Sequence, residues 1–310
     1  MNFLADGTFA KHVTLLYCSM MSAKGFRSWI IRHPLLLVAV GLFVIDIIIG
    51  LQFFAQRRVL TVAFLDVGQG DAVFIQAPNG NQLLYDAGPP SGALLRSLSD
   101  VMPFYDRSID VAVLSHPDMD HVGGFLDVFS RFAVSAVLLS GANSENGIYD
   151  EVVQTIAGNH TAHFIARKGM QVNLGDGVVV DVLYPDRDTT RMETNEASIV
   201  LRIHYGETAF LLSGDLPSAL EEYVVAREGS NLHANVIKLG HHGSRTSTSP
   251  LFLVAVHPDI AVVSAGLNNR YGHPHKEVLD ELKEFNIPAL STATEGSIIF
   301  ESDGSQVLRK

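Results

Sequence analysis

The chain has 310 residues, of which 47% are hydrophobic, and a formal net charge of −11 from 22 Lys and Arg against 33 Asp and Glu. Its single cysteine, Cys18, excludes an internal disulfide framework, and its length allows one large domain or two small ones. The acidic balance argues against extended, non-specific binding of a polyanion, because proteins that bind in that way present a basic face.

The first predicted element is an apolar run over residues 34–55, which contains one charged side chain, Asp46. The run is long enough for a helix that crosses a bilayer. Three basic residues lie shortly before it and two directly after it, a bias that favours a cytoplasmic N-terminus. The sequence therefore predicts a cytoplasmic segment over 1–33, one transmembrane helix over 34–55 and a folded extracytoplasmic domain over 59–310. Asp46 is either a functional or pairing group or a residue that a strongly apolar helix tolerates.

The rest of the chain alternates short strands with helices. Strands are predicted over 59–67, 72–77, 82–86, 109–114, 133–139, 163–166, 178–184, 197–205, 207–213, 234–239 and 260–264, with three short strands at the end of the chain. Helices are predicted over 91–100, 120–130, 149–158, 217–227, 250–257 and 275–285. This order fits an α+β domain with two sheets and helices outside them.

The densest group of chemically active side chains follows the strand over 109–114 and precedes Gly123-Gly124. Four side chains that can bind a metal fall within six residues: His116, Asp118, Asp120 and His121. Such side chains are seldom buried unless they are paired or bind a cation. Alternation along the chain and the following reversal divide them between two directions. This division can hold two cations a few ångströms apart, as hydrolytic two-metal sites require.

This spacing resembles the His-x-Asp/His-x-Asp-His signature of the metallo-β-lactamase superfamily. Five further motifs, in the family's order, resemble the hydrolase domain of ComEC-type competence proteins over residues 59–309. They are Phe64-Leu-Asp66-Val-Gly-Gln-Gly-Asp71-Ala, Leu84-Tyr-Asp86-Ala-Gly88, Leu211-Leu-Ser-Gly-Asp215-Leu, Leu239-Gly-His241-His242-Gly-Ser244-Arg-Thr-Ser and Tyr271-Gly-His273-Pro-His275. The resemblance implies a four-layer αββα sandwich, the metallo-β-lactamase fold, that binds two divalent metal ions.

The resemblance also implies how the metal ligands divide between the two ions. Asp215 is expected to bridge them, although it could also cap the helix that begins near residue 217. The register of the motif that begins at Leu239 favours His241 as the final histidine ligand. It leaves His242 to act on substrate or on a ligand. The expected first site is His116, Asp118 and Asp215, and the expected second site is Asp120, His121, Asp215 and His241.

The first site lacks the third histidine of the wider superfamily, because the segment over 194–198 carries Asn195 and Ser198 there. These two side chains are candidates for substrate binding. A site richer in oxygen than in imidazole shifts metal preference from zinc towards manganese, with magnesium as a further option.

The remaining candidates are expected to handle protons, bind substrate or orient ligands. Asp120, His242 and His273 are the catalytic candidates, since imidazoles and carboxylates suit proton transfer; the alternative for His273 is a structured turn before the helix at 275. Substrate-binding candidates in the loop after His242 are Ser244, Arg245, Thr246 and Ser247, for which the alternative is a helix entry with Ser249 as its cap. Three aspartates are expected to orient ligand histidines or else to form turns: Asp66, Asp71 and Asp86.

The function implied by the resemblance is a membrane-anchored phosphodiesterase or nuclease that uses water activated between two metal ions. Its expected place is the cell (inner) membrane, as a single-pass protein with the hydrolase domain outside the cytoplasm. The expected partners are a phosphodiester substrate, with single-stranded DNA as a candidate, the lipid bilayer through residues 34–55, and a membrane channel. Two alternatives remain: a phosphodiesterase for a small phosphocholine- or nucleotide-like ester, and a non-catalytic accessory subunit of a DNA-translocation channel.

Overall fold

A computed structural model describes residues 33–56 and 59–310, which belong to two units, residues 1–57 and 58–310. In the first unit, helix α3 covers Pro34–Gln56, and its side chains are described only over 34–48 and at Gly50. Among the described residues, no helix combines the length and the apolar character needed to cross a membrane. The transmembrane helix predicted over 34–55 is therefore not confirmed, and residues 1–32 of the predicted cytoplasmic segment lie outside the described part.

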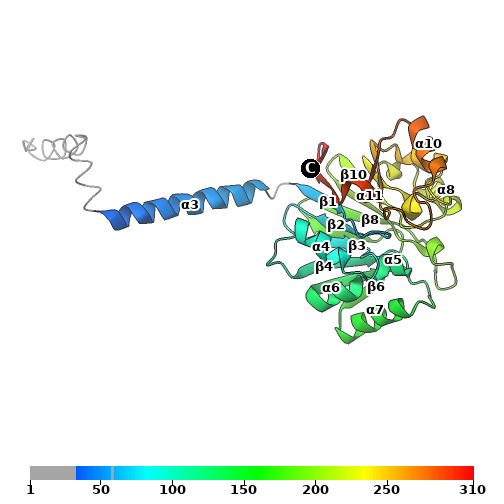
Figure 1. Cartoon of the computed structure of the whole chain (residues 1–310), viewed down its shortest axis with the longest axis horizontal. Coiled ribbons are helices and arrows are strands. Elements are labelled where there is room, and N and C mark those ends of the chain that lie inside the picture. Colours follow the sequence, from blue (N-terminus) through cyan, green and yellow to red (C-terminus); the bar gives the residue numbers. More distant parts are fainter. Residues whose placement is uncertain (1–32, 57–58) are drawn as a thin grey trace, which may run out of the picture. The chain divides into compact units, whose positions relative to one another are not determined.

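The second unit is built on two β-sheets (Figure 1). The eight strands of the first sheet lie in the order β15 (Val307–Arg309), β14 (Ile298–Ser302), β1 (Leu60–Phe64), β2 (Val73–Gln76), β3 (Gln82–Tyr85), β4 (Ser108–Leu114), β5 (Ala133–Leu139) and β6 (Ala162–Ile165). The seven strands of the second lie in the order β13 (Ala289–Ser291), β12 (Ile260–Val263), β11 (Val236–Lys238), β10 (Thr208–Leu212), β9 (Val200–Tyr205), β8 (Val178–Tyr184) and β7 (Gln171–Gly175). Strand β7 is absent from the sequence prediction.

Helices cover the outer face of each sheet. Those packed on the first sheet are α4 (Ala93–Val101), α5 (Met119–Val122), α6 (Phe125–Arg131) and α7 (Gly147–Gly158). Those packed on the second are α8 (Ser218–Glu228), α9 (Pro250–Val256) and α10 (Lys276–Glu284). The short elements are α11 (Thr292–Glu295) and the 3₁₀ turns η1 (Asn195–Ala197), η2 (Gly229–Leu232) and η3 (Gly240–Gly243). The predicted four-layer αββα sandwich is confirmed.

Alternation along the strands supplies the apolar layers. In β1, Phe64 faces the core between the sheets, while Ala63 packs under the helices of the first sheet. Between the sheets, the ring of Phe300 lies 6.0 Å from that of Phe64 and 6.2 Å from that of Phe210, centroid to centroid. Strands buried on both faces read as nearly continuous apolar runs, as these do.

The helix predicted over 120–130 is interrupted, and α5 and α6 are separate helices. A Cβ atom at Gly124 would lie 2.1 Å from the carbonyl oxygen of Ala87. Only glycine permits this approach of the loop after β4 to the loop after β3. The two loops meet at the edge where the parallel strands of the first sheet end.

Candidate metal centre

The candidate site lies where strands of both sheets end. Asp86 follows β3, His116 follows β4, Asp215 follows β10, and His241 and His242 follow β11. Strand β3 pairs in parallel with β4, and β10 pairs in parallel with β11. Crevices outside the carboxyl ends of parallel strands are common ligand sites, because loops from neighbouring strands meet there.

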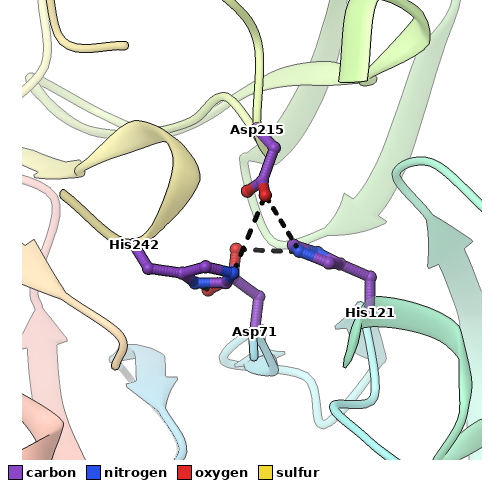
Figure 2. A group of neighbouring side chains, drawn as sticks. All are labelled: Asp71, His121, Asp215 and His242. Carbon is purple, nitrogen blue, oxygen red and sulfur yellow. Dashed lines mark ion pairs between the residues drawn. The ribbon is translucent and has the colours of Figure 1, made fainter. Parts of the chain in front are cut away.

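One carboxylate oxygen is the centre of the group. Oδ2 of Asp215 lies 3.4 Å from Nε2 of His121, 3.6 Å from that of His241, 3.7 Å from that of His242 and 4.0 Å from that of His116. Figure 2 shows Asp215, His121, His242 and Asp71 pointing towards one another from different segments of the chain. The structure therefore brings together candidate ligands from both halves of the domain.

The backbone at η3 is strained in order to present two adjacent imidazoles. His241 has φ 48° and ψ 47°, and His242 has φ 57° and ψ 25°. Residues other than glycine pay roughly 1–2 kcal/mol each for this left-handed conformation. Hydrogen bonds hold the turn: the His241 N–H donates to the Gly214 carbonyl at 3.1 Å, and the His275 N–H donates to the Gly243 carbonyl at 2.9 Å.

A second close approach brings Asp71 to the site. The Asp71 N–H donates to the carbonyl oxygen of Asp120 at 3.2 Å. A Cβ atom at Gly70, whose φ is 133°, would lie 2.2 Å from that same oxygen. Glycine at position 70 therefore lets the loop before β2 touch the loop after β4.

Asp86 sets the orientation of two histidines. Nδ1 of His121 lies 2.8 Å from Asp86 Oδ2, and the hydroxyl of Ser115 donates to the same oxygen at 2.7 Å. Because the Ser115 proton is used in that bond, its oxygen accepts from Nδ1 of His116, 2.9 Å away. Both imidazoles thus carry a proton on Nδ1 and direct Nε2 towards the centre, which supports the predicted orienting role of Asp86.

His242 is oriented in the same way by different partners. Its Nδ1 lies 3.0 Å from the Ser264 carbonyl and 3.2 Å from Asp71 Oδ1, both of which only accept. Its Nε2 lies 3.3 Å from Asp120 Oδ2. The Nε2 atoms of His116, His121 and His242 are all buried and have no hydrogen-bond partner, which is rare for buried polar atoms that bind nothing.

These residues fit a metal centre. Two ligands of one tetrahedral cation lie roughly 3.3–3.6 Å apart when each bond is about 2.0–2.2 Å. Around the second site, with His242 in place of the expected His241, the distances from His121 to Asp215 and from His242 to Asp120 and Asp215 are 3.4, 3.3 and 3.7 Å. Around the first, Nε2 of His116 lies 3.7 Å from Asp118 Oδ2. Imidazole and carboxylate donors together suit zinc and manganese.

The electrostatics of the site also favour added positive charge. Burial lowers the pKa of His242, but the carboxylates of Asp215 and Asp71 outweigh burial and raise that pKa to about 10. Burial likewise opposes the charge on His121, yet Asp215 and Asp86 raise its pKa well above the usual value. Burial and the charge on His121 lower the pKa of His116 to about 3. The carboxylates therefore hold protons on two imidazoles, and a metal that binds there releases them.

The two adjacent histidines differ in their surroundings. Both have Nε2 within 4 Å of Asp215, so this distance does not separate them. His242 is buried and also faces Asp120, whereas the His241 side chain is 29% exposed and its Nδ1 lies 3.2 Å from the Thr246 hydroxyl. Burial and the Asp120 contact favour His242 as the ligand, in contrast to the register-based expectation for His241, and leave His241 facing solvent.

Several substrate-binding candidates support the backbone instead. The Asp215 N–H donates to the Ser198 hydroxyl at 3.1 Å, and the buried Ser247 hydroxyl donates to the Leu216 carbonyl at 2.8 Å. The Ser244 hydroxyl accepts from that of Thr246 at 3.0 Å. The backbone N–H of Arg245, an exposed residue, donates to Nδ1 of His275.

Three further candidates, Asn195, His273 and Asp66, have different surroundings. The Asn195 side-chain oxygen is buried without a hydrogen-bond partner. The His273 ring lies 5.5 Å from that of His241, and burial with its charged neighbours lowers its pKa to about 4, so it is neutral at pH 7. The Asp66 carboxylate accepts from the Gly68 N–H at 3.0 Å within its own turn, which fits the turn-forming alternative.

A cleft of about 420 Å³ opens beside Asp120. It is lined by Gln69, Pro89, Met119, Asp120, Asn269, Arg270 and Tyr271. Met119 and Tyr271 are each 49% exposed, and the Arg270 guanidinium carbon lies 4.8 Å from the centre of the Tyr271 ring. Sequence reasoning missed Arg270 and Met119, although Arg270 directly precedes the Tyr271 motif and Met119 lies between Asp118 and Asp120.

Comparison with known proteins agrees with this geometry. The family model of the metallo-β-lactamase superfamily matches residues 65–267. The chain belongs to the metallo-β-lactamase superfamily. Its fold is shared with CmlA, a diiron β-hydroxylase from Streptomyces venezuelae, at TM-score 0.51 and 16% identity over 81% of this chain and 54% of that one.

Within the superfamily, the predicted resemblance to competence proteins is confirmed. Competence protein ComA of Neisseria gonorrhoeae is 35% identical over 239 residues, which cover 77% of this chain and 32% of that protein. ComE operon protein 3 of Bacillus subtilis is 29% identical over 253 residues, which cover 76% of this chain and 32% of that protein. The chain therefore spans about a third of the length of these relatives.

A buried carboxylate holds the backbone of the loop after His242. Glu221 of α8 accepts from the backbone N–H groups of Thr248 and Ser249, each at 2.7 Å. Burial outweighs these bonds and raises the pKa of Glu221 from 4.5 to about 7. The folded state therefore binds this proton more tightly than the unfolded state, and ionisation of Glu221 costs stability.

We expect a pH-dependent stability difference between the wild type and Glu221→Gln. The contribution of Glu221 is complete below pH 4.5 and is lost as the pH rises towards and past 7. The free energy of unfolding of the wild type, minus that of the variant, should fall by about 3 kcal/mol between pH 4 and pH 8. Denaturant titrations at several pH values, with a chelator present, measure it. A difference that does not vary with pH would contradict the raised pKa.

Proposed function

We propose that this protein is a metal-dependent phosphodiesterase that cleaves DNA, with single strands as the preferred form. The observation that carries the proposal is the set of unpartnered imidazole Nε2 atoms around Asp215, beside a cleft that contains Arg270. Similarity to competence proteins supports DNA as the substrate class. The acidic charge of the chain favours contact with a short stretch of strand over a long one.

Each residue has a role that its contacts support. Two divalent cations, zinc or manganese with magnesium as a further option, would supply Lewis acidity and an activated water when bound. His121, His242, Asp120 and Asp215 would hold one of them, and His116 and Asp118 would share the other with Asp215. Asp86 and Asp71 fix the imidazoles so that Nε2 points inwards.

The cleft provides the groups that a nucleotide needs. Arg270 is exposed and interacts electrostatically with Asp120, which places a cation where phosphate charge would develop. Met119 and Tyr271 offer apolar and aromatic surface on which a base can stack. The volume of about 420 Å³ also suits a small nucleotide-like phosphodiester, which is the second candidate substrate.

Loss of a ligand should abolish hydrolysis. With Mn²⁺ or Zn²⁺, the full-length chain is expected to cleave bis-p-nitrophenyl phosphate and single-stranded DNA. Asp120→Asn and His242→Gln should each lower kcat/KM by roughly 100-fold or more, since even residues that only orient metal ligands contribute 10- to 100-fold. His241→Gln should have a smaller effect on metal affinity. Rates of p-nitrophenol release and gel assays of labelled DNA measure the hydrolysis of the two substrates.

Matched controls carry the same substitutions away from the site. Asp150→Asn on α7 and His163→Gln on β6 alter exposed residues and should leave kcat/KM unchanged. Full activity in Asp120→Asn would remove the catalytic proposal. A metal-loaded wild type that cleaves neither substrate would instead favour the accessory-subunit alternative.

Base recognition in the cleft predicts a selective loss. Tyr271→Ala should raise KM for thymidine 5′-p-nitrophenyl phosphate by about 10-fold, since stacking contributes roughly 1–3 kcal/mol per base. It should leave KM for methyl p-nitrophenyl phosphate unchanged. Tyr105→Ala, at a tyrosine that is 66% exposed but does not line this cleft, is the control. Equal effects on both esters would show that the cleft does not read a base.

We also propose that residues 34–55 hold the protein in the inner membrane with the hydrolase domain outside the cytoplasm. The run carries one charged side chain, Asp46, and more basic residues precede it than follow it. The protein should stay in the membrane fraction after a carbonate wash, and Leu42→Lys with Ile45→Lys should release it. Protease added to spheroplasts should digest residues 59–310 while a cytosolic marker survives; full protection would reverse the orientation. A channel partner is part of this proposal and rests on the resemblance to competence proteins.

A further inference from the structure

A buried lysine lies directly behind the metal centre. Lys238 ends β11 between Ile237 and Leu239 and is fully buried. Its Nζ lies 2.5 Å from Asp71 Oδ2 and donates to the Leu239 carbonyl at 2.9 Å. A buried ammonium group is costly unless it is paired, and an otherwise apolar strand gives no packing reason for one.

Its partner, Asp71, is also fully buried and stands between this lysine and the histidines. Oδ1 of Asp71 lies 3.2 Å from Nδ1 of His242, and Oδ2 lies 3.7 Å from Nδ1 of His121. These contacts involve the ring nitrogens that point away from Asp215. Asp71 nevertheless offers an oxygen that lies within 4.8 Å of ligand atoms of His121, Asp215 and His242, so proximity alone would also allow it to bind a metal (Figure 2).

We propose that Lys238 is a positioning residue that keeps Asp71 from binding the metal; this inference rests on the proposed metal centre. The ammonium group lies against one carboxylate oxygen of Asp71, and the other oxygen lies 3.2 Å from Nδ1 of His242. A cation that approached the first oxygen would meet the positive charge of Lys238. Asp71 therefore orients His242, and the number of ligands at the second site stays fixed.

The charge balance of the site agrees with this role. Five aspartates surround the centre: Asp71, Asp86, Asp118, Asp120 and Asp215. Two divalent cations and one ammonium group neutralise five carboxylates. Without Lys238, Asp71 would lose its ammonium partner, and the nearest remaining cation would be the metal.

A lysine that only stabilised the fold through an ion pair would have a different effect when it is removed. If Lys238 only stabilises the fold, its removal lowers the melting temperature and leaves the coordination of the metal unchanged. If it positions Asp71, its removal changes the ligand set. Co²⁺ distinguishes the two cases, because its visible absorption reports the number and type of ligands independently of catalysis.

The test uses the full-length chain loaded with Co²⁺. We expect Lys238→Met to weaken and shift the visible bands, as a rise in coordination number would, and to change the Co²⁺ dissociation constant by about 10- to 100-fold in chelator competition. Lys238→Arg should keep the wild-type spectrum, because it retains the charge. The double variant Lys238→Met with Asp71→Asn should return the spectrum towards the wild type, since an amide is a poor metal ligand.

Controls separate the outcomes. Lys168→Met removes a lysine that pairs with Glu228 on another part of the domain, and it should leave the spectrum unchanged. If Lys238→Met does not fold, Asp71→Asn alone decides: it should keep the wild-type bands with weaker affinity, and a loss of a ligand would overturn the proposal. An unchanged spectrum in folded Lys238→Met also overturns it. A wild type that binds no Co²⁺ would refute the metal centre itself.

Discussion

Buried negative charge is the constraint that organises this domain. Asp71, Asp86 and Asp215 are almost fully buried at the strand ends. Carboxylates that have lost their hydration are stable only next to cations or strong donors. The chain supplies Lys238, the Ser115 hydroxyl and imidazoles raised to high pKa for this purpose. Protons on His121 and His242 are replaceable, so the same charge that must be balanced for folding becomes affinity for a metal ion.

The sandwich turns this constraint into geometry. Asp71, Asp86 and the loop after β4 belong to the first sheet, whereas Asp215 and His242 belong to the second. The apolar layer between the sheets, with Phe300 between Phe64 and Phe210, sets the distance between these halves. Neither sheet alone carries a complete site. Cation binding across the edge would therefore tie the two sheets together where their packing ends.

Local sequence patterns predicted much of the fold and of the candidate site. Contacts between residues far apart in the sequence account for most of what these patterns missed. The fold class and the cluster from His116 to His121 could be predicted because strand alternation and ligand spacing are local. Strand β7 was missed because the alternation of polar and apolar residues in Gln171-Val172-Asn173-Leu174 covers only four positions, of which Leu174 alone is fully buried. The pair of Lys238 and Asp71 joins residues 167 positions apart, and no local signal reports it. The surroundings of His241 and His242 depend on the left-handed backbone conformation of both residues, which two consecutive histidines do not predict.

The two halves of the site differ in exposure, and this difference bears on where a substrate would meet it. His121, His242 and Asp215 are buried, and their free atoms face one another. Asp118 and Asp120 have side chains that are 38% and 32% exposed, and His241 is exposed to a similar degree. Where the resemblance implies a third histidine, the chain carries Asn195 and Ser198, and the buried Ser198 hydroxyl accepts from the Asp215 N–H. Under the proposed function, each of the two cations would contact buried imidazole and one partly exposed carboxylate, Asp118 in the first site and Asp120 in the second. A substrate would therefore approach both cations from the side of these carboxylates.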